Sequence, residues 1–200
     1  MSQQRFRLSG GTELSFTTAG DASMPAVLLL HGFPGSARTF REVVPELSRA
    51  AYVIAPDLPG FGESDVLPAV SFPAFGQAIS ELVDRLGTGP RYIYLHDFGA
   101  PQRALVRDYG NYVARFDEIA AYLARWQPRS LMLWGRHDPF FDLAEVLSWM
   151  RTLPRMEAHV FDAGHKLLET HAAAASSLMR DFIVHTQRES QASSEADRRG

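Results

Sequence analysis

Short runs of consecutive apolar residues alternate along the chain with segments whose apolar residues recur every three or four positions. The continuous runs occupy residues 26–30, 51–55, 92–95 and 131–134, and residues 159–161 form a shorter strand-like segment. They are typical of strands that are buried on both faces. The helical spacing is found in residues 36–50, 71–86, 116–126, 142–150 and 167–184. This alternation predicts an α/β fold with an open, mostly parallel sheet and helices on both of its faces.

The two ends of the chain differ from this pattern. Residues 5–8 and 13–17 flank the sequence SGGT, which predicts a hairpin with a two-residue turn because glycines tolerate positive φ. Residues 186–200 are polar and contain no large apolar side chain, which predicts a disordered tail. We therefore expect one folded domain over residues 1–185.

Composition narrows the classes of partner. The chain has 200 residues, of which 46% are hydrophobic and 22% charged, as in an ordinary globular protein. The formal net charge of −3 argues against nucleic acid as a partner. The absence of cysteine excludes disulfides and a thiolate nucleophile, and no histidine pair has the spacing of a metal site. No apolar run is long enough to span a bilayer, so we expect a cytoplasmic protein that needs neither membrane nor cofactor.

Polar residues follow every predicted parallel strand. The loops read HGFPG after residue 30, PDLPGFGESD after 55, HDFGAP after 95, GRHDPFF after 134 and DAGHKLLETH after 161. In open parallel sheets, ligands bind outside the carboxyl ends of the strands. These loops are therefore the first place to look for a site.

This ordered set of loops resembles the α/β-hydrolase superfamily over about residues 10–185, and within it the branch with an aspartate nucleophile, such as epoxide hydrolases and haloalkane dehalogenases. The resemblance implies that Asp97 is the nucleophile on a sharp strand-to-helix turn, Asp138 the acid and His165 the base, in the chain order of that fold. It also implies that the backbone N–H groups of Phe33 and Phe98 form an oxyanion hole.

The implied reaction is hydrolysis of a small electrophilic molecule by water, without a cofactor. An aspartate with a pKa near ~3.9 is ionised at neutral pH and attacks carbon without a base. His165 then activates the water that cleaves the aspartyl ester, while Asp138 orients the imidazole. Because the dehalogenase pattern has Asn and Trp where Phe33 and Phe98 stand, the resemblance favours an epoxide over a haloalkane.

Each candidate residue also has a structural interpretation. Asp97 could cap a helix, Asp138 precedes Pro139 as in many turns, and His165 could be a hydrogen-bonded surface histidine. The remaining polar residues of these loops are expected to be structural. We expect His31 and His96 to support loops, His137, His171 and His185 to face solvent, and Asp57, Glu63 and Asp65 to act as caps and turn formers.

The interval between Asp97 and Asp138 is only 41 residues, and a strand, helix and strand already need about 30. The helical cap domain of the family, which supplies substrate-shaping tyrosines, and one core strand therefore have no counterpart here. Tyr109, Tyr112 and Tyr122 are candidates for that role only by proximity. An open sheet edge could pair two chains in a homodimer, and Leu95 should crowd the nucleophile turn. The alternative function is thus a non-catalytic remnant or binding module.

Overall fold

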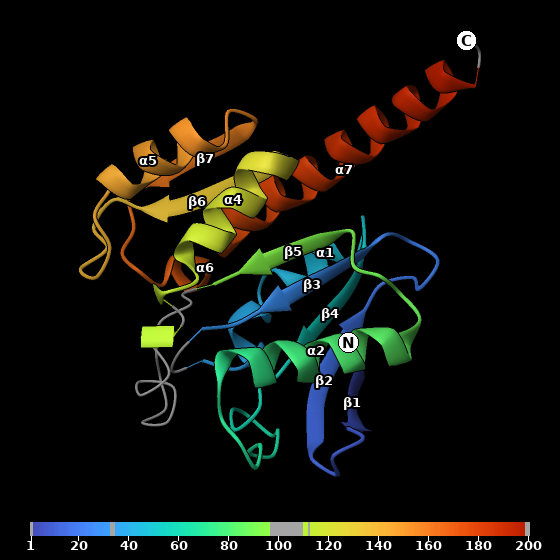
Figure 1. Ribbon diagram of the computed structural model, residues 1–200. Coiled ribbons are helices and arrows are strands. Elements are labelled where there is room, and N and C mark those ends of the chain that lie inside the picture. The colour runs from blue at the N-terminus through green and yellow to red at the C-terminus, as the bar shows by residue number, and fades with distance from the viewer. Residues whose placement is uncertain (1, 33–34, 97–109, 112, 199–200) are drawn as a thin grey trace. The chain divides into compact units, whose positions relative to one another are not determined.

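The computed structural model describes residues 2–32, 35–96, 110–111 and 113–198 (Figure 1). The chain divides into two compact units, Met1–Ala114 and Arg115–Gly200, and the single domain over residues 1–185 stays a prediction. Each unit is described by itself.

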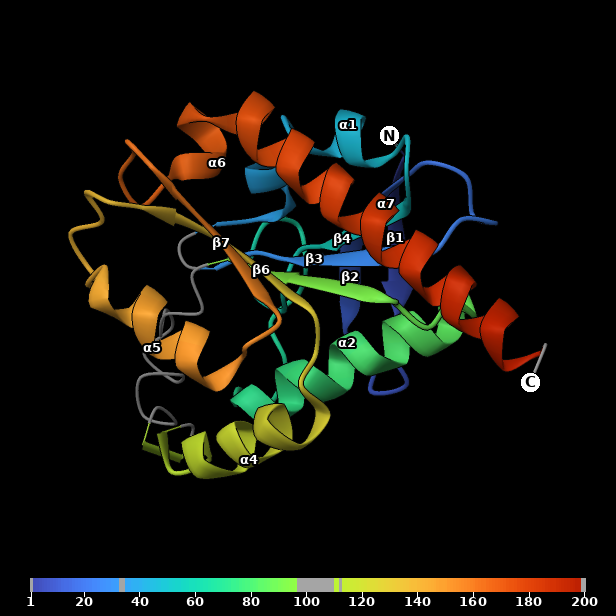
Figure 2. The ribbon, with the colours of Figure 1, turned by 90° about the horizontal axis from the view of Figure 1, so that it is seen from above.

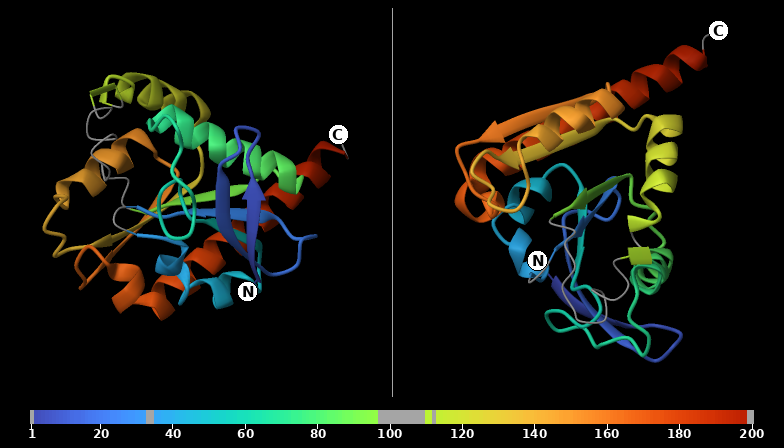
Figure 3. Two further views of the ribbon diagram at one scale, coloured as in Figure 1. Left: turned by 90° about the horizontal axis from the view of Figure 1, so that it is seen from below. Right: turned by 60° about the vertical axis from the view of Figure 1, so that its left-hand side comes forward.

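The first unit contains a five-stranded sheet. Its strands are β1 (Ser2–Arg7), β2 (Glu13–Ala19), β3 (Ala26–Leu30), β4 (Tyr52–Pro56) and β5 (Tyr92–Leu95), in the order β1-β2-β4-β3-β5. Strand β3 pairs in parallel with β4 and β5, whereas β2 is antiparallel to β1 and β4. The predicted strands are thus confirmed, and the hairpin β1–β2 lies at one end of the sheet (Figure 3).

The turn between β1 and β2 differs from the predicted one. The N–H of Leu8 donates to the carbonyl of Thr12 at 2.8 Å, so residues 9–11 form a three-residue loop. Gly11 has a φ of +87°, which is a conformation that only glycine adopts at low cost. The N–H of Gly11 closes the loop by donating to the carbonyl of Leu8 at 2.9 Å.

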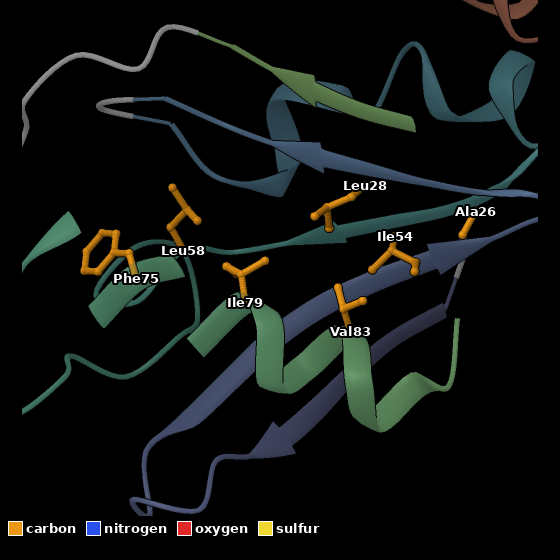
Figure 4. Packing of buried hydrophobic residues seen from close by; sticks show 7 residues of the cluster. All are labelled: Ala26, Leu28, Ile54, Leu58, Phe75, Ile79 and Val83. Atoms are coloured by element: carbon orange, nitrogen blue, oxygen red, sulfur yellow. The ribbon is translucent and has the colours of Figure 1, made fainter. Parts of the chain in front are cut away.

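Helix α2 (Phe72–Leu86) packs against one face of the sheet. Ser71 caps its first turn by accepting a hydrogen bond from the N–H of Ala74, and Gly87 ends it with a φ of +66°. The apolar stripe of α2, the inward-facing residues of β3 and β4 and one residue of the loop after β4 form a cluster of Ala26, Leu28, Ile54, Leu58, Phe75, Ile79 and Val83 (Figure 4). Burying one large aliphatic side chain contributes roughly 1.5–3 kcal/mol, so this cluster is a main source of the unit's stability.

The opposite face of this sheet is covered by a 3₁₀ turn, η1 (Ala37–Phe40), and a short helix, α1 (Val44–Leu47) (Figure 2). The sequence predicted one continuous helix here. The helix is broken because Pro45 has no N–H and its ring collides with the carbonyl four residues earlier. The expected stripe is nevertheless buried, since Phe40 and Val44 are at most 1% exposed.

The second unit is built on a two-stranded parallel sheet. Its elements are α4 (Phe116–Trp126), β6 (Ser130–Gly135), α5 (Ala144–Thr152), β7 (Met156–Phe161), α6 (Leu167–Thr170) and α7 (Ala172–Asp197). Strand β6 pairs with β7 over its full length, from Ser130 opposite Met156 to Gly135 opposite Phe161. Helix α7 contacts β6 and α5 contacts β7, and together they bury Val146, Met179 and Ile183.

The end of the chain is more ordered than predicted. The structure continues α7 through Asp197, whereas the sequence predicted a disordered tail from residue 186. Hydroxyl groups on α7 donate to the carbonyl four residues earlier, as Ser190 does to Thr186 and Ser193 to Glu189. Glu189 also pairs with Arg129, which ties this part of the helix to the segment before β6. No helix of the described residues combines the length and the apolar character that crossing a bilayer requires.

Candidate active site

Two loops of the second unit meet because the strands before them are parallel neighbours. Strands β6 and β7 run in the same direction in full register, so both end at the same edge of their sheet. Residues 136–143 follow β6 and residues 162–166 follow β7. These are the loops that carry Asp138 and His165, the predicted acid and base.

Asp138 and His165 form a close hydrogen-bonded pair. The Nδ1 of His165 lies 2.8 Å from Oδ2 of Asp138. The side chains are only 16% and 10% exposed for His165 and Asp138, respectively. Such shielding from water makes an electrostatic interaction stronger than it is between exposed charges. The structure therefore brings together two of the three predicted catalytic side chains, which are 27 residues apart in sequence.

The backbone fixes the orientation of the Asp138 carboxylate. Its second oxygen, Oδ1, accepts hydrogen bonds from the N–H groups of Phe140 at 2.8 Å and Phe141 at 3.2 Å. The N–H of Asp138 donates to the carbonyl of Gly135 at 3.1 Å. The turn expected at the Asp138-Pro139 pair is thus present, and it directs Oδ2 at His165.

The contact with Asp138 determines what His165 can do. An ionised carboxylate only accepts hydrogen bonds, so Nδ1 of His165 carries the proton and the lone pair of the neutral ring is on Nε2. The rings of Phe140 and Phe141 lie 5.0 Å and 5.9 Å from the imidazole ring. This arrangement is suited to a general base whose cation is stabilised by the carboxylate behind it.

The remaining predicted site residues belong to the first unit. Strand β5 ends at Leu95, and the N–H of His96 continues the pairing by donating to the carbonyl of Leu30 at 2.9 Å. Asp97 and Phe98 come directly after this pairing. They and Phe33 lie outside the described residues, as do Tyr109 and Tyr112, so their roles stay predictions. Tyr122 lies on α4 and is 60% exposed.

His31 supports a loop, as the sequence predicted. It is fully buried, its Nδ1 donates to the carbonyl of Gly32 at 2.9 Å, and its Nε2 accepts from the N–H of Leu58 at 2.9 Å. Because Nε2 accepts, the ring is neutral. Burial lowers the pKa of His31 below its ordinary value of 6.5, against smaller opposing effects of the Gly32 carbonyl and the Asp57 carboxylate.

This buried histidine predicts a pH dependence of stability. In the unfolded chain His31 takes up a proton near pH 6.5, whereas in the folded chain it does so only at lower pH. The free energy of unfolding should therefore be highest above pH 6.5 and fall as the pH decreases toward the folded-state pKa, by at most about 1.4 kcal/mol per pH unit from this group. Urea unfolding of wild type and His31→Gln between pH 5 and 8 measures this pH dependence of the free energy of unfolding. His185→Gln, at an exposed position on α7, should keep the wild-type slope.

Asp57, Asp65 and Glu63 are structural, as predicted. The buried Asp57 accepts hydrogen bonds from the backbone N–H groups of Ala37 at 2.7 Å and Glu63 at 3.0 Å. Asp65 accepts from the N–H of Glu13 at 3.0 Å, and the Glu63 side chain lies 3.6 Å from Arg5. These bonds join the loop after β4 to η1 and to the hairpin.

Sequence reasoning missed the cluster around the pair. Arg136 and His137 both contact Oδ1 of the exposed Asp162, at 2.9 Å and 2.8 Å. His137 faces solvent as predicted but is also hydrogen-bonded. Nothing in the sequence indicates this cluster, because it depends on the register of β6 and β7. The described parts of the chain contain no group of three or more acidic or histidine side chains that could hold a metal ion.

Comparison with known proteins shows similarity concentrated in the first unit. Residues 25–114 match the family model described as alpha/beta hydrolase fold. An uncharacterised hydrolase of Saccharomyces cerevisiae is 37% identical over 99 residues, which are 48% of this chain and 34% of that protein. Epoxide hydrolase 2 of Siraitia grosvenorii is 38% identical and haloalkane dehalogenase of Bradyrhizobium diazoefficiens is 32% identical, each over 44% of this chain. In both of these the match spans 29% of the relative, so the chain covers only about a third of the curated relatives.

Solved structures extend the similarity of the fold to nearly the whole chain. A putative ancestral haloalkane dehalogenase superposes with a TM-score of 0.79 and 15% identity, covering 94% of this chain and 100% of that one. A loop variant of a haloalkane dehalogenase from Bradyrhizobium elkanii gives a TM-score of 0.74 and 18% identity, covering 94% and 98% of the two chains. The protein therefore has the α/β-hydrolase fold, and its relatives include epoxide hydrolases and haloalkane dehalogenases.

Proposed function

We propose that this protein is a hydrolase that opens small electrophiles, epoxides ahead of haloalkanes, through a covalent ester on Asp97. The observation that carries the proposal is the shielded Asp138–His165 pair with its 2.8 Å hydrogen bond. The relatives named as hydrolases support the reaction class. Water and a small uncharged molecule are the substrates, and no cofactor takes part.

The first half of the proposed reaction needs a nucleophile but no base. A carboxylate oxygen of Asp97 attacks a ring carbon of the epoxide, the carbon–oxygen bond of the ring breaks, and the released oxygen takes up a proton. The product of this half is a hydroxyalkyl ester of Asp97. A haloalkane would give the corresponding alkyl ester and a halide ion.

The second half uses the pair seen in the structure. Nε2 of His165 takes a proton from water as the water oxygen attacks the carbonyl carbon of the ester. Asp138 stabilises the imidazolium that forms, because its carboxylate already accepts the Nδ1 proton. Collapse of the tetrahedral intermediate releases the diol and restores the Asp97 carboxylate, which retains an oxygen atom from water. The His165 imidazolium then returns its proton to the solvent, which balances the proton taken up by the epoxide oxygen in the first half.

The preference for epoxides rests on two positions. Phe33 and Phe98 stand where the dehalogenase pattern has Asn and Trp, whose N–H groups would bind a leaving halide. A phenylalanine side chain has no donor for that purpose. We therefore expect epoxides to be opened faster than haloalkanes of the same carbon skeleton.

Isotope labelling tests the proposal. The protein is incubated in H₂¹⁸O with matched epoxides and haloalkanes, product is measured, and the peptide that contains Asp97 is examined by mass spectrometry. Repeated turnover should place ¹⁸O in the Asp97 carboxylate, because water attacks the carbonyl carbon of the ester. Turnover without label in this peptide would exclude the ester mechanism, and absence of turnover across the panel would overturn the proposed activity.

A second function, binding of another copy of the chain, is favoured by the edge strand β5. Among the described strands, β5 pairs only with β3, and its outer side chains Ile93 and Leu95 are 60% and 59% exposed. A short edge strand with exposed apolar side chains is a template for pairing with another strand. This observation fits the non-catalytic alternative, in which the fold serves association.

This second function predicts a dimer that depends on β5. Sedimentation of the wild type should then show a dimer, and Ile93→Lys should shift it to a monomer because a charge on the edge disfavours pairing. Val66→Lys is a matched control, since Val66 is 61% exposed and lies outside the strand. A wild type that remains monomeric at high concentration would contradict this function.

A further inference from the structure

The acid loop and the histidine loop touch through their backbones at Gly135. A Cβ atom placed on Gly135 would lie 2.3 Å from the carbonyl oxygen of Gly164 and 2.6 Å from that of Ala163. Both distances are far below a van der Waals contact, and both neighbours are backbone atoms that no side-chain rotation can move away. Gly164 directly precedes His165, so the contact lies one residue from the imidazole.

Hydrogen bonds of the residues after Gly135 hold this close approach. The N–H of Arg136 donates to the carbonyl of Phe161 and the N–H of His137 to that of Ala163, each at 3.0 Å. Farther out, Arg136 and His137 contact the carboxylate of Asp162. The residues that follow Gly135 are thus joined to the residues that precede Gly164 by contacts that extend from the end of the strands to the surface.

We propose that Gly135 is a positioning residue, whose lack of a side chain sets the distance between Asp138 and His165. Asp138 is three residues after Gly135 and bonds back to its carbonyl at 3.1 Å, and His165 follows the carbonyl group that Gly135 accommodates. A side chain at Gly135 therefore pushes the two loops apart where they carry the acid and the base. The proposal deepens the proposed function and rests on it for its catalytic consequence only.

The same loop contact offers a matched control at Gly164. Among the described residues, a Cβ atom on Gly164 meets only the carbonyl oxygen of His137, at 3.9 Å, which is an ordinary contact. Gly164→Ala adds the same methyl group to the same interface without displacing either loop. The comparison of Gly135→Ala with Gly164→Ala therefore distinguishes the effect of moving the loops apart from the general effect of an added methyl group.

The direct test is the NMR signal of the His165 Nδ1–H in protein labelled with ¹⁵N-histidine, with Asp138→Ala as the reference for a lost acid contact. Gly135→Ala should show the His165 signal displaced toward that reference, and Gly164→Ala should show the wild-type signal. With an epoxide that the wild type turns over, Gly135→Ala should lower kcat about 100-fold with little change in KM. A folded Gly135→Ala protein with the wild-type His165 signal would overturn the proposal, even if the protein hydrolyses nothing.

If Gly135→Ala does not fold, the same NMR measurement on Asp162→Asn tests whether contacts between the two loops position His165. This exposed substitution adds no atoms to the contact and removes the charge that Arg136 and His137 share. The Nδ1–H signal of His165 should move in the same direction as in Asp138→Ala, by a smaller amount, and high salt should move the wild-type signal likewise. An unchanged signal in Asp162→Asn would show that contacts between the loops do not set the distance between Asp138 and His165. This result would overturn the proposal.

Discussion

Replacing Asp138 with asparagine should reduce turnover on the order of 10⁴-fold, the size of the effect in the Ser-His-Asp triad, while the protein stays folded. The reason lies in the bonds of the carboxylate. Oδ1 accepts two backbone N–H groups, so the oxygen of the new amide takes that position and its NH₂ group faces His165. The NH₂ group is a donor only. Nδ1 must then accept, the ring proton moves to Nε2, and the base is lost.

Steady-state kinetics with an epoxide substrate, combined with circular dichroism, measures this effect. Asp142→Asn is the matched control, because Asp142 lies in the same loop and its carboxylate accepts a hydrogen bond from the N–H of Ala144 at the start of α5. Turnover by Asp142→Asn should remain within a few-fold of wild type. Equal rates for Asp138→Asn and wild type would mean that His165 does not act as the base.

Replacing Gly62 with alanine should destabilise the first unit by about 3 kcal/mol. Gly62 has a φ of +53°, and a Cβ atom there would lie 2.3 Å from the carboxyl carbon of Asp57. The carboxylate is unable to yield, because Asp57 is buried and holds the N–H groups of Ala37 and Glu63. Left-handed strain and overpacking each cost about 1–3 kcal/mol.

Urea unfolding of Gly62→Ala and Gly76→Ala side by side measures this difference. Gly76 lies inside α2, and no described residue outside the helix backbone is within 4 Å of a Cβ atom placed there. The same substitution should therefore stabilise the protein at Gly76, by about 1 kcal/mol, through the better helix propensity of alanine. Equal midpoints for Gly62→Ala and wild type would show that the loop after β4 relaxes around the new side chain.

The sequence predicted the elements that local chemistry determines. Helix α2 was predicted closely because Ser71, the apolar stripe and Gly87 all indicate the same bounds. Strand β7 was predicted only in its last half, because the polar Glu157 interrupts the apolar run before it. Pro45 broke a predicted helix, and long-range contacts such as that of Glu189 with Arg129 extend α7 into a polar segment.

The candidate site was predictable to the same degree. Asp138 and His165 follow successive strands, and the parallel pairing of those strands is enough to bring them to one edge. The contact at Gly135 and the cluster around Asp162 were not predictable, because they depend on which backbone atoms face each other across β6 and β7. Patterns along one chain contain no such register information. The roles of Asp97, Phe33 and Phe98 stay predictions.

The central claim is that His165 releases an ester formed on Asp97, and intact-protein mass spectrometry of His165→Gln with styrene oxide tests it most directly. Without the base the first half of the reaction should proceed and the second should stop, so the variant should gain the mass of one styrene oxide on the peptide that contains Asp97. Wild type should show little of this adduct, and Asp97→Asn none. An adduct on another residue, or a His165→Gln protein that stays unmodified while wild type turns the epoxide over, would contradict the account.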